Sequence, residues 1–237
     1  MKKILFAFAA LACLGHAAVA VAADATTDFS ITNGNPNGAW SYGYTTTLGG
    51  SFSAYSQAGN LTAPPTQSGT LETWSDVAAF ANVPWVGKAG VAGWTCCSSV
   101  TVAANTLTMH PGGNGEFSVV RFTSASGGSF QVNASFFGQD NGGASGTTTD
   151  VHVRTTADVF TSAVVGFGTT VSYSGVVTLA AGQTMDFVVG IGGNNYFNDS
   201  TGLTASVSVV PEPEGVVLAL AGLAVAAAAA GQRRKSA

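Results

Sequence analysis

Apolar and polar residues alternate with a period of two through the second half of the chain. The pattern is clearest at residues 130–136 (FQVNASF), 151–154 (VHVR), 171–173 (VSY), 185–191 (MDFVVGI) and 203–209 (LTASVSV). Successive side chains of a strand point to opposite faces, so this alternation predicts half-buried antiparallel strands. Between the two chain ends, no segment has helical periodicity over three turns.

Turn-forming clusters separate these segments. They lie at residues 127–128, 141–143, 166–168, 180–182 and 192–195, and are rich in Gly and Asn, which tolerate positive φ angles. The clusters divide the region after Glu116 into six or seven strands. This pattern predicts an all-β fold, an antiparallel β-sandwich, over residues 24–209.

The segment from Asp28 to Asn105 is less regular. Its clearest apolar pieces are residues 40–44 and 83–86. Because long alternating runs are missing, we expect this half to supply edge strands and long loops.

The amino-terminal end has the pattern of a secretory signal peptide. A basic start, Met1-Lys2-Lys3, precedes an apolar helix-forming run, and Ala-x-Ala sites follow at residues 18–20 and 20–22. This pattern predicts export by the general secretory machinery and removal of residues 1–23 by signal peptidase.

The carboxy-terminal end, residues 210–237, predicts a single transmembrane helix. Val-Pro-Glu-Pro-Glu at 210–214 precedes residues 215–230, none of which can ionise, and these would span about 24 Å as a helix. That length is slightly short of the ~30 Å hydrocarbon core of a bilayer. The end segment 231–237 carries a cytoplasmic basic anchor, made of Arg233, Arg234 and Lys235, which places the amino-terminal part outside.

This tail resembles the PEP-CTERM sorting signal of Gram-negative bacteria. The resemblance rests on Pro211, Glu212 and Pro213, the apolar span and the basic end. It implies that an exosortase, a membrane-embedded cysteine transpeptidase, recognises the motif and cuts near it. The precursor would then lie in the inner membrane and the product at the cell surface or outside, in the exopolysaccharide (biofilm) matrix. A plain anchor that is never processed is the alternative, with the same topology but a retained span.

Charge limits the partners of the ectodomain. Residues 24–210 contain three Lys and Arg residues against ten carboxylates, a formal charge of −7. Nucleic acids and anionic lipid surfaces both need clustered cations, so this charge argues against both.

The ectodomain has two adjacent cysteines, Cys96 and Cys97. In an oxidising compartment these thiols would not both stay free by default, and three outcomes remain open: a vicinal disulfide, two buried thiols, or a link to a second copy. No metal site is expected around them, because no His or third Cys lies at zinc-binding spacing.

Catalytic patterns are scarce, and rings are the better candidates for function. No Gly-x-Ser-x-Gly motif occurs, His152 is expected on a polar strand face, and His110 precedes a turn. Aromatic rings in polar, Gly-rich segments could stack on sugars, although such rings are often buried. The candidate ligand-binding residues are Trp40, Tyr42, Trp85, Tyr196 and Phe197.

The ectodomain also resembles the jelly-roll domains of exported bacterial proteins. The residues concerned are 35–43, 110–112, 186–190 and 199–203. The resemblance implies a sandwich like those of carbohydrate-binding modules. We expect a structural, non-enzymatic surface protein, with carbohydrate (lectin-like) binding to exopolysaccharide as the alternative.

Two further alternatives involve carboxylates. A polysaccharide hydrolase could use Glu72 with Asp76, or Glu116 with a loop Asp, as its pair of acids. No cofactor is expected, but a structural calcium ion could bind residues 140–143 with Asp150, or Asn194 and Asn195 with Asp199.

Overall fold

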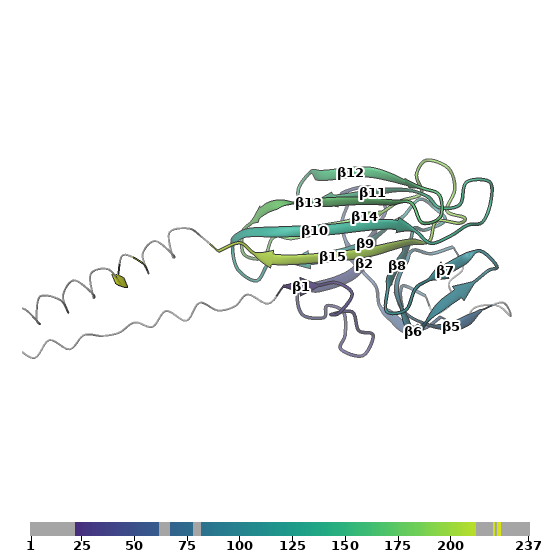
Figure 1. Cartoon of the computed structure of the whole chain (residues 1–237), viewed down its shortest axis with the longest axis horizontal. Coiled ribbons are helices and arrows are strands. Elements are labelled where there is room, and N and C mark those ends of the chain that lie inside the picture. The colour runs from purple at the N-terminus through teal and green to yellow at the C-terminus, as the bar shows by residue number, and fades with distance from the viewer. Residues whose placement is uncertain (1–21, 62–66, 78–81, 212–219, 221, 224–237) are drawn as a thin grey trace, which may run out of the picture. The chain divides into compact units, whose positions relative to one another are not determined.

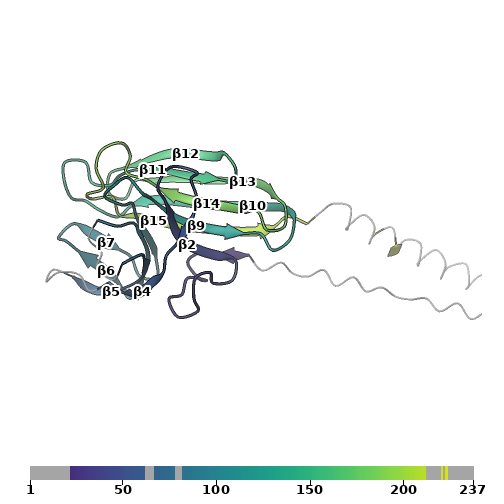
Figure 2. The same cartoon turned by 180° about the vertical axis from the view of Figure 1, so that it is seen from behind.

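The computed structural model describes residues 22–61, 67–77, 82–211, 220, 222 and 223. Residues 22–210 form one compact unit, and the two chain ends are assigned to a second. The first unit is an all-β sandwich of two antiparallel sheets, as the alternation predicts. Figures 1 and 2 show the two sheets from opposite sides.

Sheet A has nine strands within the described residues. Its spatial order is β13 (Thr170–Leu179), β10 (Gly128–Gly138), β15 (Thr201–Val209), β8 (Leu107–His110), β6 (Trp85–Cys96), β5 (Ser68–Ser75) and β4 (Gln57–Asn60). Two short strands extend it: β1 (Ala23–Asp24) pairs with β15, and β7 (Val100–Val102) pairs with β6.

Sheet B has six strands in the same described part of the chain. Its order is β12 (Asp158–Val165), β11 (Thr148–Arg154), β14 (Thr184–Val189), β9 (Phe117–Thr123), β2 (Trp40–Thr45) and β3 (Ser53–Ala54). The region after Glu116 thus holds seven strands, β9 to β15, which confirms the prediction of six or seven.

The main core lies between the sheets and follows the predicted alternation. In β10 the apolar residues Phe130, Val132 and Phe136 are buried, whereas Asn133 between them is exposed. Val151 and Val153 of β11 face the same core. Burying alternate apolar side chains is therefore what holds the two sheets together.

The first half of the sandwich is more regular than its sequence predicts. It contains β6, which at 12 residues is the longest strand, and β6 pairs with β5, β7 and β8. A second cluster, including Leu71, Trp94 and Val102, packs on this part of sheet A. The expectation of edge strands is confirmed for β3 and β4, which lie at the ends of their sheets, but it is wrong for β6, whose three glycines hide the alternation.

One of those glycines is required by a close approach of the backbone. Gly69 of β5 has φ 82°, and a Cβ atom there would lie 2.0 Å from the carbonyl oxygen of Gly93 in β6. The register of β5 against β6 shifts at this point. A glycine that looks like a strand breaker in the sequence thus allows two strands to pair across an irregularity.

Most of the predicted sorting tail lies outside the described residues. Pro211 is described and exposed, whereas Glu212, Pro213 and the basic anchor are not among the residues described. Leu220, Gly222 and Leu223 are helical and exposed. Among the residues that the structure covers, no helix is both long and apolar enough to cross a membrane.

Candidate binding site on the loop between β14 and β15

Strand β11 holds the loop of residues 190–200 in place. The backbone N–H of Gly192 donates to Oδ1 of Asp150 (2.7 Å), and Nδ2 of Asn194 donates to Oγ1 of Thr148 (2.6 Å). At the other end of the loop, Oδ1 of Asp199 accepts bonds from the N–H and the hydroxyl of Thr148, both 3.1 Å long. Several hydrogen bonds at its base therefore fix the loop before any ligand arrives.

Four rings form a continuous column that ends at the tip of this loop. Trp85 stacks on His110 (ring centroids 5.4 Å apart), and His110 meets Tyr196 edge-on (6.2 Å). Tyr196 contacts Phe197 (4.4 Å), whose side chain is 61% exposed. Trp85 is buried and the other two rings are half-buried, so the exposed Phe197 rests on a packed base.

Amide and carboxylate groups surround the column. The Tyr196 hydroxyl donates to Oδ1 of Asn82, and Gly113 approaches both residues closely. In the same turn, Glu116 accepts bonds from the backbone N–H and the side-chain amide of Asn114 (3.0 and 2.9 Å). The site thus combines an apolar ring surface with nearby donors and acceptors, a combination typical of small-molecule sites.

His110 supports the column as a neutral ring. Its Nδ1–H donates to the carbonyl oxygen of Pro111 (2.8 Å), and burial lowers its pKa below the usual value. A neutral imidazole can stack between Trp85 and Tyr196 without the desolvation cost of a charge.

The structure places the five predicted ring residues in three different environments. Trp40 and Tyr42 are fully buried in the main core, so we correct their prediction as ligand-binding residues: neither ring has a face open to a ligand. Trp85 is only 6% exposed and acts as the base of the column. Tyr196 and Phe197 lie at the surface together.

Sequence reasoning missed His110 and Asn82 as parts of this site. His110 lies 86 positions before Tyr196 and Asn82 lies 114 before it, so only the fold brings them together. The alternation in residues 40–45 could have identified Trp40 and Tyr42 as core residues rather than ligand-binding ones. They occupy alternate positions of one strand and therefore share one face of the sheet.

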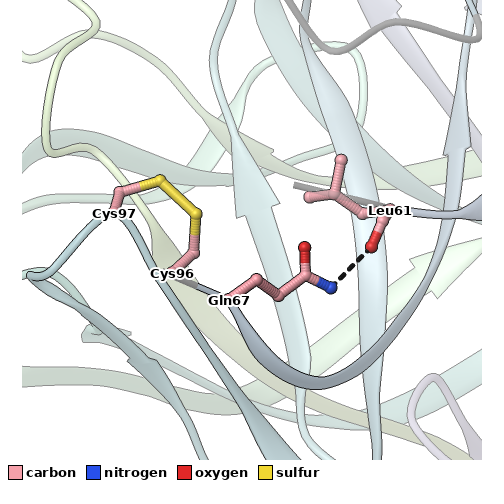
Figure 3. Close-up of a disulfide and its surroundings, with 4 residues drawn as sticks. All are labelled: Leu61, Gln67, Cys96 and Cys97. Atoms are coloured by element: carbon pink, nitrogen blue, oxygen red, sulfur yellow. Dashed lines mark hydrogen bonds between the residues drawn. A yellow bond between two sulfur atoms is a disulfide. The ribbon is translucent and has the colours of Figure 1, made fainter. Parts of the chain in front are cut away.

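The structure joins Cys96 and Cys97 in a disulfide (Figure 3). Cys96 is buried at the end of β6, whereas Cys97 is exposed in the turn to β7 and has φ 60°. Close by, Nε2 of Gln67 donates to the carbonyl oxygen of Leu61 (2.7 Å; Figure 3).

This turn also reaches the loops beside the ring column. The carbonyl oxygen of Ser99 accepts a bond from the N–H of Asn141 (3.1 Å). A Cβ atom on the neighbouring Gly142 would lie 2.3 Å from Oδ1 of Asn198, so the two loops are in close contact. The disulfide turn is therefore connected to the ring-bearing loop through one intervening loop.

A polar cluster on sheet B corrects the placement of His152. Its side chain is 8% exposed rather than at the surface, and Nε2 lies 3.0 Å from Oδ2 of Asp150. Asp158 lies beside the ring, 3.5 Å from Nδ1, and also forms an ion pair with Arg154 (2.7 Å). These ionisable groups therefore form hydrogen bonds and ion pairs with one another.

The carboxylates considered for calcium are bonded to groups of the protein. Asp140 accepts a bond from the N–H of Gly142 (2.7 Å), and Asp150 and Asp199 hold the loop as described above. Within the described ranges, no three His, Cys, Asp or Glu side chains are placed to hold a metal ion.

Asp199 is the most perturbed carboxyl group of the site. It is fully buried, Oδ2 has no hydrogen-bond partner, and burial raises its pKa to about 7, with Asp140 and Asp150 adding repulsion. Its bonds to Thr148 oppose this rise. The carboxyl group therefore changes protonation near neutral pH.

No family model matches the chain, and no curated protein matches it. Solved structures similar to it include a CBM51 module of Clostridium perfringens GH95 with methyl-galactose (15% identity, TM-score 0.33, 65% of this chain and 94% of that one). A family 35 carbohydrate-binding module of Clostridium thermocellum is also similar (11%, 0.29, 65% and 100%). A third is the enzymatically active domain of a bacteriophage CBA120 tailspike protein (10%, 0.33, 77% and 21%). Identities of 10–15% and TM-scores of 0.29–0.33 carry no argument about the site. We therefore interpret the site from its own geometry.

Proposed function

We propose that residues 22–210 form a non-catalytic, carbohydrate-binding domain that uses Tyr196 and Phe197 to bind sugars. The observation that carries this proposal is the supported ring pair, with Phe197 61% exposed and four aromatic or imidazole rings in contact. A single exposed Phe would need no explanation. A ring held on a rigid loop beside amides can stack on the apolar face of a sugar while its hydroxyls are hydrogen-bonded.

The second part of the proposal concerns the place of the protein in the cell. The signal peptide would direct export, and an exosortase would then process the tail at Pro211, Glu212 and Pro213. The domain would act at the cell surface or in the exopolysaccharide matrix of a Gram-negative bacterium. The supported rings favour a binding role there over a purely structural one.

The committed ionisable groups argue against the hydrolase alternative. His152, Asp150, Asp158 and Arg154 pair with one another, and Glu116 is bonded to Asn114. A glycoside hydrolase needs one carboxyl group kept as an acid and a second free to act as base or nucleophile. Of the carboxyl groups near the ring site, Asp199 is fully buried and Glu116 is bonded to Asn114, so neither is free to act on a substrate.

Glycan-array binding of the purified full-length protein tests the ring site. We expect Phe197→Ala to weaken binding about tenfold, because a stacking contact is worth about 1 kcal/mol or more. Tyr196→Ala should have a similar effect, since it removes the ring beneath Phe197.

Phe167→Ala is the matched control, because Phe167 is 51% exposed but lies in the turn between β12 and β13. It should leave binding unchanged. Equal losses in the Phe167 and Phe197 variants, or no glycan bound by the unmodified protein, would contradict the proposal.

A further inference from the structure

A polar face of sheet A carries the further inference. Strands β13, β10 and β15 are neighbours, and their register places polar residues side by side in rows that run across the strands. One row consists of Ser172, Ser135 and Thr204. The next row consists of Ser174, Asn133 and Ser206. These side chains alternate with the core residues of the same strands, so they point away from the core. In these two rows the face is therefore an ordered array of hydroxyl and amide groups.

No residue of these three strands is charged. Solvent-facing sheets usually carry Lys or Glu, especially near an edge such as β13. Hydroxyls and amides can both donate and accept hydrogen bonds, as sugar hydroxyls do. A neutral polymer can cover these three strands without desolvating a charged side chain on any of them.

The array lines a shallow groove of about 260 Å³, which ends at Asp24 of β1. Four adjacent strands cross it, so its width is about three inter-strand spacings, or ~14 Å. Oδ1 of Asp24 already accepts bonds from the N–H groups of Thr26 and Thr27 (3.0 and 2.8 Å). Asp24 is the one carboxylate among its lining residues, and one of its two oxygens is already bonded within the protein.

Neighbouring side chains fix part of the array and leave the rest available. Ser135 and Ser172 share a hydrogen bond of 2.8 Å, and the Ser174 hydroxyl donates to Oδ1 of Asn133 (2.8 Å). Thr204 and Ser206 make no side-chain hydrogen bond to another described residue. Positioned but unsaturated polar groups are what a polyhydroxylated ligand requires.

We propose that this groove is a second binding site, which takes a linear, neutral polysaccharide lying across the strands. The absence of cationic side chains in the three strands and the formal charge of −7 on residues 24–210 both argue against an acidic polymer. The site does not depend on the ring column, because the two share no residue.

Affinity gel electrophoresis of the full-length protein tests this site, with dextran and hydroxyethyl cellulose as neutral polymers and alginate as the acidic one. The variant Asn133→Ala/Thr204→Ala/Ser206→Ala should bind the neutral polymers about tenfold more weakly, because it removes several hydrogen bonds. Thr204→Lys should do the same by placing a charge in the groove. Alginate should not retard any form.

The control variant Thr156→Ala/Thr161→Ala changes exposed hydroxyls near β12 in sheet B and should migrate like the unmodified protein. Phe197→Ala separates the two proposals, because it removes the ring site and leaves the groove intact. Three outcomes would overturn the groove: equal migration of the groove and control variants, equal retardation by alginate, or no retardation by either neutral polymer. A loss confined to Phe197→Ala would leave only the ring site.

Discussion

Asp199 lies at the base of the ring-bearing loop, with one carboxyl oxygen bonded to Thr148 and the other without a partner. Burial raises its pKa to about 7, against 3.8 in an unfolded chain. Between these values the folded protein keeps a proton that the unfolded chain releases. Rising pH therefore favours unfolding across this interval, and the effect is complete above about pH 7.

We therefore expect Asp199 to lower the free energy of unfolding as pH rises from about 4 to about 7. Denaturant unfolding at several pH values measures this, and Asp199→Asn should remove that part of the dependence. Glu72→Gln, which changes an exposed carboxylate on β5, should leave the profile unchanged. A profile of Asp199→Asn that matches the unmodified protein would show that the carboxyl group titrates normally.

Residue identity predicted three of the four rings of the site, Trp85, Tyr196 and Phe197, and could not predict the rest. Tyr196 and Phe197 stand out because two rings lie among Asn residues in a turn. His110 and Asn82 come from distant segments, and their role follows from the pairing of β6 with β8 and from the position of the loops. Ring count and polar context also could not separate Trp40 and Tyr42, which are core residues, from exposed rings.

At the level of elements, the strands after Glu116 were predictable because each buries one face. In such strands the alternation of apolar and polar residues in the sequence matches the alternation of buried and exposed side chains, as in β10 and β15. Strand β6 was not predicted because its three glycines interrupt the alternation of apolar and polar residues. Its pairing depends on contacts with distant strands rather than on a local pattern.

The turn between β6 and β7 contains the smallest loop that a disulfide can close. In the chain-entropy model a disulfide stabilises by restricting the unfolded chain, and the gain grows with loop length. For adjacent cysteines that gain is about 1 kcal/mol, below the 2–4 kcal/mol of typical disulfides. We expect the reduced protein to unfold with a free energy only about 1 kcal/mol lower than the oxidised protein.

Denaturant unfolding with and without a phosphine reductant measures this difference. A Cys96→Ala/Cys97→Gly variant serves as the control, since glycine accepts the positive φ at position 97. It should not respond to the reductant. Loss of cooperative folding on reduction would contradict the prediction.

For the whole molecule, the proposed sorting route predicts two forms of different mass. Cells with an active exosortase should contain a product that ends near Pro211–Pro213 and lacks Arg233, Arg234 and Lys235. Cells without the enzyme should retain the longer form in the membrane fraction. Intact-mass analysis of both fractions tests this, and an extracellular product that still carries the basic end would refute the sorting proposal.

The pairing of β1 with β15 places the entry and exit of the sandwich side by side. Ala23 lies opposite Val207, and the chain leaves the unit at Val210, just past the end of β15 (Figure 1). The ring-bearing loop precedes the opposite end of this nine-residue strand, about 30 Å away. An attachment made at Val210 would therefore lie at the opposite end of β15 from the ring-bearing loop.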